Sequence, residues 1–175
     1  MKGTRHNGRS GKNGVYNPLH NDRRFNPEHS EHIANDRVHQ NIYWDCYQGY
    51  TTMEDRGKDD NFSFNQIEMA YYDENYGEYV TNQNDRHKKA RHPDRCKSVE
   101  DVLKNKKTCP EESIYQLGTM DEHASVEMLV TIFDEFKKEF DERFGSNVHI
   151  IDWSLHMDEA TPHIHERHVF DATNR

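Results

Sequence analysis

The chain has 175 residues, of which 32% are hydrophobic and 31% are charged, and its formal net charge is −9. This length fits one domain and the low apolar content indicates a thin core, so we expect a single domain spanning residues 1–175. No segment approaches the roughly 20 apolar residues of a membrane span, and no apolar stretch follows the N-terminal charges as in a signal peptide. The composition therefore favours a soluble, cytoplasmic protein with no membrane partner.

The charges are segregated along the chain. Residues 1–40 and 81–110 carry net charges of +3 and +5, whereas residues 41–80 and 111–175 carry −7 and −10. Because phosphate binding depends on lysine and arginine, the two basic segments could form a local nucleic-acid surface on an acidic body. The run at residues 86–92 fits a solvated basic loop equally well, and charge alone does not separate the two interpretations.

The N-terminal part of the sequence contains few signals of regular structure. Residues 1–27 are rich in Gly, Asn, Arg and Pro and indicate an irregular arm, whereas the aromatic and β-branched residues 41–47 predict a strand. Residues 51–62 have the composition of a loop. Ser63 and Gln66 have the spacing of a capping box, which predicts that a helix begins after Ser63.

The middle of the chain predicts further helices and a strand. Residues 81–97 are expected to form a basic loop, a short helix begins after Ser98, and residues 114–117 form a strand. Residues 126–144 place six apolar side chains on one helical face, so we expect a core helix that ends at Gly145. The order of elements predicts an α+β fold, with helices packed on one face of an antiparallel β-sheet and an irregular N-terminal arm.

The C-terminal segment combines alternation with histidines. Over residues 148–156 the period is two, so Trp153 and Leu155 are expected to pack on the helices while His156 emerges on the opposite face. A turn follows, and the next strand, from residue 163, places His163 and His165 on one side. If the two strands form a hairpin, three imidazoles converge, as a divalent-metal site with an open position requires. A histidine-rich, solvated hairpin is the alternative interpretation.

Two motifs, taken together, resemble a known family. The pair of histidines around a hydrophobic residue is the HUH pattern of enzymes that cut single-stranded DNA. Residues 20–25 (HNDRRF) with 35–41 (NDRVHQN), followed by 156–165 (HMDEATPHIH), resemble the motifs of the MobV-type (Pre/Mob) plasmid mobilisation relaxases, which are HUH-like endonucleases. The motifs occur in the family's order, and the resemblance covers nearly the whole chain.

The resemblance implies a fold, an activity and site residues. It implies an HUH relaxase-like fold and metal-dependent nicking of one strand at a plasmid origin of transfer, with single-stranded or supercoiled plasmid DNA as the partner. In this family the histidine that corresponds to His20 is the nucleophile, and it forms a covalent bond to the 5′-phosphate. The metal ligands would be His156, His163 and His165, with Mn²⁺ or Mg²⁺ as the cofactor; three imidazoles favour Mn²⁺.

Two further residues have expected roles, one of them left open. Arg23 would hold the phosphate. Glu159 would either orient or deprotonate the imidazole, or complete the metal shell, and the sequence does not decide which. The expected DNA path runs over basic residues of the N-terminal part and of the basic loop, namely Arg5, Arg9, Arg24, Arg37, Lys88, Lys89 and Arg91.

Several alternatives remain open at this stage. His6 begins a second HNxR segment and is a rival nucleophile, as are the hydroxyls of Tyr43, Tyr47 and Tyr50. A non-covalent phosphodiesterase with Glu159 as general base is a second function, and an inactive, zinc-stabilised DNA-binding module is a third. Family members are longer, so we expect a catalytic domain truncated at its C-terminus, with a possible homodimer formed through the missing region.

Overall fold

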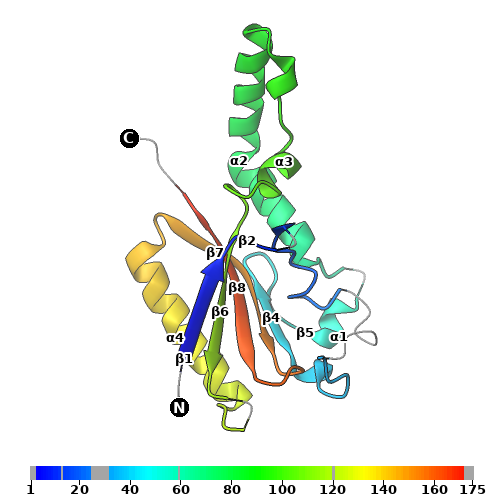
Figure 1. Cartoon of the computed structure of the whole chain (residues 1–175), viewed down its shortest axis with the longest axis vertical. Coiled ribbons are helices and arrows are strands. Elements are labelled where there is room, and N and C mark those ends of the chain that lie inside the picture. Colours follow the sequence, from blue (N-terminus) through cyan, green and yellow to red (C-terminus); the bar gives the residue numbers. More distant parts are fainter. Residues whose placement is uncertain (1–2, 13, 25–31, 59, 120, 172–175) are drawn as a thin grey trace.

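A six-stranded antiparallel sheet forms the centre of the structure, a computed structural model that describes residues 3–12, 14–24, 32–58, 60–119 and 121–171 (Figure 1). From one edge to the other, its strands are β1 (Gly3–Gly8), β6 (Glu111–Leu117), β8 (His163–Phe170), β7 (Val148–His156), β4 (Ile42–Asp45) and β5 (Gly49–Thr52). A separate small hairpin consists of β2 (Ser10–Gly11) and β3 (Gly14–Val15). The strands that carry His156, His163 and His165, β7 and β8, are therefore the central pair.

Two long helices cover opposite faces of this sheet. Helix α4 (Val126–Phe144) packs its Leu129 and Phe133 against a cluster that includes Trp153 and Ile164. Helix α2 (Phe64–Lys89) packs Ile67 and Tyr72 against Ile151 and Val169 on the other face. The remaining helical segments are short: α1 (Met53–Arg56), α3 (Val99–Leu103) and the 3₁₀ turns η2 (Val38–Gln40) and η3 (Pro93–Arg95).

A β-bulge in β7 changes which face of the sheet its apolar residues point to. The pairing of β7 with β8 shifts between Ile150 and Asp152, so one extra residue is accommodated there. Ile150 consequently belongs to the α4 side and Ile151 to the α2 side. Beyond the bulge the predicted alternation holds, because Trp153 is buried on the α4 side while His156 faces the α2 side.

The α+β class and the antiparallel sheet are confirmed, but the helices lie on both faces rather than on one. The irregular arm predicted for residues 1–27 is wrong in part, because β1 within it pairs with β6 at the edge of the sheet. The loop predicted for 51–62 is also wrong in part: β5 extends to Thr52, whose side chain caps α1.

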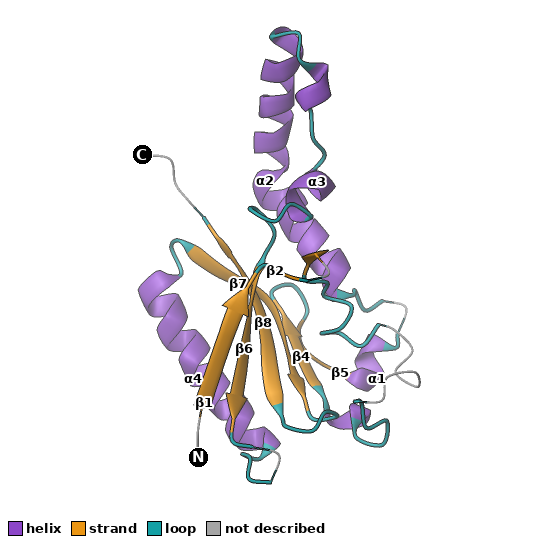
Figure 2. Ribbon diagram, in the orientation of Figure 1, coloured by secondary structure: helices purple, strands orange, loops and turns teal. Residues whose placement is uncertain are grey.

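The basic loop predicted for residues 81–97 is largely helical instead. Helix α2 continues to Lys89, so the arm that it forms with α3 projects well beyond the sheet (Figure 2). Arginine and lysine are good helix formers, and at a helix C-terminus their charges interact favourably with the helix dipole. A run of basic residues is therefore as compatible with the last turns of a helix as with a loop.

Three predicted helix starts are confirmed by their capping contacts. Ser63 accepts a hydrogen bond from the backbone of Gln66, and Ser98 accepts one from Asp101. Helix α4 begins at the N-cap Ser125, and its predicted core face is only partly buried, with Ile132 and Phe144 exposed. None of the helices in the described part of the chain combines the length and apolar character needed to cross a bilayer.

Candidate metal centre

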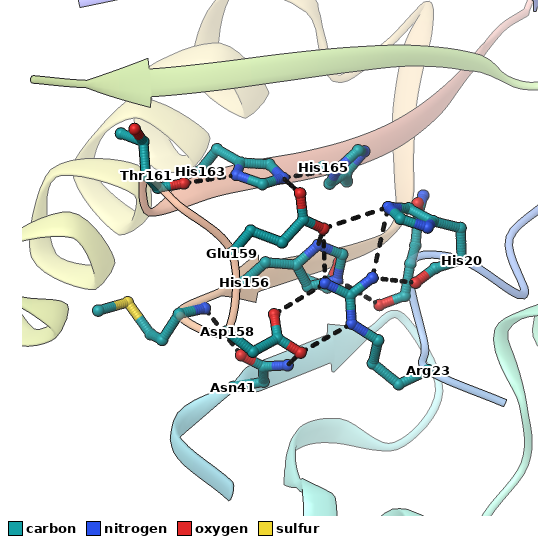
Figure 3. Close-up of polar contacts among 12 residues, drawn as sticks. His20, Arg23, Asn41, His156, Asp158, Glu159, Thr161, His163 and His165 are labelled. Atoms are coloured by element: carbon teal, nitrogen blue, oxygen red, sulfur yellow. Dashed lines mark hydrogen bonds and ion pairs between the residues drawn. The ribbon is translucent and has the colours of Figure 1, made fainter. Parts of the chain in front are cut away.

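Three imidazoles meet where the two central strands come together. His156 ends β7 and pairs in register with His163, the first residue of β8, while His165 lies opposite Ser154. The ring centroids are 5.4 Å apart for His156 and His163, 4.9 Å for His156 and His165, and 4.8 Å for His163 and His165 (Figure 3). The hairpin thus produces the convergence that the alternation predicts.

Each of these rings is anchored through one nitrogen. The acceptors are the Asn21 carbonyl, 2.8 Å from His156 Nε2; the Thr161 carbonyl, 2.8 Å from His163 Nδ1; and Glu112 Oε1, 3.1 Å from His165 Nδ1. A carbonyl or an ionised carboxylate can only accept, so these nitrogens carry the protons. The other nitrogen of each ring then presents a lone pair, which is how metal-ligating histidines are normally oriented.

The facing lone pairs fit a cation. His163 Nε2 and His165 Nε2 lie 3.0 Å apart, and neither carries a proton in the tautomers assigned above. His156 Nδ1 is buried and has no hydrogen-bond partner among the described residues. A buried acceptor left unpaired is costly, and a divalent ion of the kind bound by imidazole would satisfy His156 Nδ1.

The protonation state of the histidines suits ligation. Burial lowers the pKa of His156 well below its ordinary value, and the positive charge of Arg23 lowers it further. Burial, together with the neighbouring His165, also lowers the pKa of His163. Both rings therefore stay neutral at pH 7, the form in which histidine binds metals.

Glu159 is the carboxylate of this centre. Its Oε1 lies 3.4 Å from His20 Nε2 and 3.7 Å from His156 Nδ1, and its Oε2 lies 3.8 Å from His163 Nε2. Burial by itself raises the pKa of Glu159, but hydrogen bonds from His20 and Arg23 outweigh it and lower that pKa below its ordinary value. Ligand atoms of His156, Glu159 and His163 lie within 4.8 Å of one another, as do those of His20, His156 and His165.

His20 lies at the accessible side of the centre. Its ring centroid is 5.6 Å from that of His156 and 5.4 Å from that of His165, and its side chain is 41% exposed. The ring is therefore close enough to attack a group bound at the centre and open enough to meet an incoming substrate.

The residues that follow His20 fix it to the rest of the molecule. Asn21 donates to Glu112 Oε2 at 2.8 Å. Asp22 accepts from the backbone N–H of Phe64, the first residue of α2, at 2.9 Å. Arg23 forms a bidentate pair with Asp158 through hydrogen bonds of 2.9 and 2.8 Å. Sequence reasoning did not identify Asn21, Asp158 or Glu112, because their partners are distant in the chain.

Asn41 is a further residue that sequence reasoning missed. Its Nδ2 donates to Asp158 Oδ2 at 2.8 Å, and its Oδ1 accepts from the backbone N–H of Met157 at 2.7 Å. Asn41 lies inside residues 35–41, the second of the family-like segments, and this position was the only sequence signal that could have indicated its role. It supports the turn that carries Glu159.

The rival nucleophiles lie elsewhere. His6 belongs to the edge strand β1, where it pairs with Ile114. Tyr43 is completely buried, the hydroxyl of Tyr47 donates to Glu74 on α2, and that of Tyr50 donates to Asp134 on α4. Of the candidates, His20 is the one placed against the three imidazoles.

The expected DNA-binding residues do not form one surface. Arg37 lies beside the centre and donates to the Glu159 carbonyl at 3.3 Å, and Arg24 donates to the Asn61 carbonyl at 3.0 Å. Arg5 lies over the ring of Tyr115, on the α4 side of the sheet. Arg9 bonds the Cys109 carbonyl, and Lys88, Lys89 and Arg91 lie at the far end of α2 (Figure 1).

Comparison with known proteins identifies the fold. No family model matches the sequence, and no curated protein matches it. Solved structures do match, and the chain has the fold of a plasmid relaxase domain of the MobV (Mob_Pre) class, as the resemblance predicts.

The particular structures are those of the MobM relaxase domain, described as Mn-bound and in complex with plasmid pMV158 oriT DNA. The first has a TM-score of 0.56 and 22% identity, and covers 95% of this chain and 69% of that one. A second has a TM-score of 0.55 and 20% identity over the same shares.

Proposed function

We propose that this chain is a metal-dependent relaxase that nicks one DNA strand at a plasmid origin of transfer, in the cytoplasm. The observation that carries the proposal is the convergence of three imidazole lone pairs beside His20 and Glu159. The fold supports it, since the MobM domains with this fold are described as bound to Mn and to oriT DNA.

The metal would be held by His156 Nδ1, His163 Nε2 and His165 Nε2. Three nitrogen donors favour Mn²⁺ over Mg²⁺, which prefers oxygen ligands. When bound, such a cation neutralises the negative charge that develops on the phosphate oxygens during attack.

His20 is proposed as the nucleophile. A ring nitrogen forms a bond to phosphorus, the bond from phosphorus to the 3′ oxygen breaks, and the 5′-phosphate stays on the protein. The imidazole N–H proton is transferred to the departing oxygen, which becomes a free 3′-hydroxyl. Glu159, ionised and 3.4 Å from His20 Nε2, is placed to accept that proton and pass it on.

For Arg23 the contacts support a role other than the expected one. Its side chain is fully buried and is paired with Asp158 and Glu159, and its Nη1 donates to the His20 carbonyl at 2.9 Å. Because these acceptors engage the guanidinium, we propose that Arg23 positions the nucleophile and the turn rather than holding the phosphate.

The test is a nicking assay on a supercoiled plasmid that bears the matching origin. With Mn²⁺ the wild type is expected to relax the plasmid and to remain attached to the DNA after denaturation. His20→Ala is expected to abolish both results, while His6→Ala, the matched change in the other HNxR segment, retains them. Relaxation without attached protein would favour hydrolysis by water with Glu159 as base, and unimpaired attachment by His20→Ala would remove the proposed nucleophile.

A further inference from the structure

Two adjoining cavities lead away from His20. The first, of about 460 Å³, is lined by His20, by Lys12 of the β2–β3 hairpin and by Tyr16. The second, of about 510 Å³, is lined by Tyr16, by Asn65 at the start of α2, and by two lysines of the segment after α3, Lys104 and Lys106. Residues 15–17 line both cavities, so the cavities adjoin there. We refer to the two cavities together, which begin at the proposed nucleophile, as the groove.

Tyr16 stands at the junction of the two cavities. Its ring lies against the backbone of the preceding segment: a Cβ on Gly11 would be 3.2 Å from the ring, and a Cβ on Gly8 would be 3.6 Å from the hydroxyl. Its backbone N–H donates to the Arg9 carbonyl at 3.2 Å. The side chain nevertheless remains 37% exposed. An aromatic ring that is supported from behind and open to a groove is suited to stacking on a planar ligand.

The exposed charges along the rim of the groove are suited to binding an anion. Lys12, Lys104 and Lys106 are exposed. Lys104 contacts Glu100 at 2.5 Å, a surface pair that a phosphate could replace. The two carboxylates of the lining, Glu68 and Glu112, are buried and are both paired with Arg167. The available charges at the rim are therefore positive.

We propose that this groove binds the single strand of DNA that adjoins the scissile phosphate, with a base stacked on Tyr16 and phosphates bound by Lys104 and Lys106. A supported aromatic ring combined with flexible cations is the usual arrangement for single-stranded nucleic acids, whose bases are free to stack. Bases within a duplex are stacked on one another and could not use Tyr16. The identity of the strand rests on the proposed function, whereas its chemistry rests on the groove.

Binding can be tested in EDTA, without any cleavage, by the fluorescence anisotropy of two labelled probes. One probe is a dT decamer, and the other is a decamer of abasic sites with the same phosphates. Tyr16→Ala is expected to weaken binding of the dT decamer about 5- to 100-fold and to leave the abasic probe within about twofold. Tyr16→Phe keeps the ring and is expected to bind both probes like the wild type.

The lysines should behave in the complementary way. Lys104→Ala/Lys106→Ala is expected to weaken both probes equally and to reduce the slope of log Kd against log salt by about 1.4. The matched control, Lys138→Ala/Arg143→Ala, removes the same charge from exposed positions on α4 and should change neither quantity.

The outcomes separate this proposal from the proposed function. If Tyr16→Ala weakens both probes equally, or neither, while its thermal unfolding matches that of Tyr16→Phe, base stacking at Tyr16 is excluded. If the lysine pair and its control are indistinguishable, the phosphate path is excluded. If the wild type does not nick origin DNA but Tyr16→Ala still weakens only the dT decamer, the relaxase function is excluded and the groove proposal is supported. If the wild type nicks DNA through His20 but Tyr16→Ala changes no binding, the relaxase function is supported and the groove proposal is excluded.

Discussion

The guanidinium of Arg23 joins two segments that are more than 130 residues apart. It binds Asp158 and Glu159 from one side of the turn after β7, and its backbone adopts a φ of 55°, in the left-handed region that favours glycine. A residue held in that conformation is maintained by its surroundings. The contacts of Arg23 therefore hold the segment of His20 and the turn that carries Glu159 in one arrangement.

Removing only one partner of the Arg23–Asp158 ion pair should strongly destabilise the fold. Arg23→Met leaves the buried Asp158 without its partner, and we expect the free energy of unfolding in urea to fall by about 3–5 kcal/mol. Asp158→Asn in the same background removes the orphaned charge and should restore part of that loss. A single-variant cost below about 1 kcal/mol would show that the pair does not hold the segment.

Tyr43 gives the fold a specific sensitivity to alkali. Burial raises the pKa of Tyr43 to about 12, against about 10 in an unfolded chain. The stability that Tyr43 contributes is therefore fully present below pH 10 and is lost as the pH rises from 10 to 12. Between those values the unfolding free energy of the wild type should fall more steeply than that of Tyr43→Phe, by about 1.4 kcal/mol per pH unit. Parallel curves from urea titrations would contradict this assignment.

At the scale of single residues, the sequence predicts the proposed reacting groups better than it predicts the residues that support them. Alternation along two strands predicts that His156, His163 and His165 converge, with Glu159 in the turn between them. The resemblance to a known family is what adds His20. Several of the supporting contacts join distant parts of the chain: Asn21 and Glu112 are 91 residues apart, and Arg23 and Asp158 are 135 residues apart. No local pattern encodes such a pairing, since either partner alone is an ordinary polar residue.

At the scale of elements, helix starts were predictable because capping is local, whereas strand edges and helix faces were not. The bulge at residues 150–152 is decided by what packs on each face, and β1 becomes a strand only because β6 offers an unpaired edge. The basic residues at the C-terminal end of α2 are predicted as a loop for a similar reason, because such residues are equally compatible with a loop and with a helix end.

Replacing either of two glycines by alanine should change the stability of the fold, in opposite directions. Gly118, in the turn after β6, has a φ of 105°, and a Cβ there would overlap the carbonyl of Glu122. Gly77 lies inside α2 with no atom within 4 Å of a Cβ. Gly77→Ala should raise the free energy of unfolding by about 1 kcal/mol, because alanine is the better helix former. Gly118→Ala should lower the free energy of unfolding by more than about 1 kcal/mol. If calorimetry finds Gly118→Ala more stable than Gly77→Ala, both assignments are wrong.

For the whole molecule, the two basic segments of the sequence meet only in part. Lys104 and Lys106 of the second segment lie beside residues 15–19 of the first, whereas Lys88, Lys89 and Arg91 lie at the end of the arm that projects from the sheet (Figure 1). DNA binding by Lys88, Lys89 and Arg91 therefore stays a prediction that concerns a surface separate from the groove beside Tyr16.

Metal binding should be visible as stability of the whole fold. With Mn²⁺ at a hundredfold excess over its Kd, linkage predicts about 2.7 kcal/mol of stabilisation, or an increase in Tm of about 5 to 10 °C that EDTA reverses. His165→Ala should lose most of this increase. His149→Ala, which changes a histidine paired with Asp171 outside the centre, should keep it. Equal increases in both variants would place the ion elsewhere.

The position of β7 and β8 in the sheet has a consequence for how the protein is made. β1 with β6 and β4 with β5 can each form an isolated ribbon before β7 and β8 are synthesised, but only residues 148–170 join these ribbons. Two-stranded ribbons are marginal in water, so we expect the sheet to stay incomplete until residues 148–170 have left the ribosome. The three candidate metal-binding histidines lie on the same two strands that join the ribbons, so the candidate metal centre and the continuous sheet should form in one step.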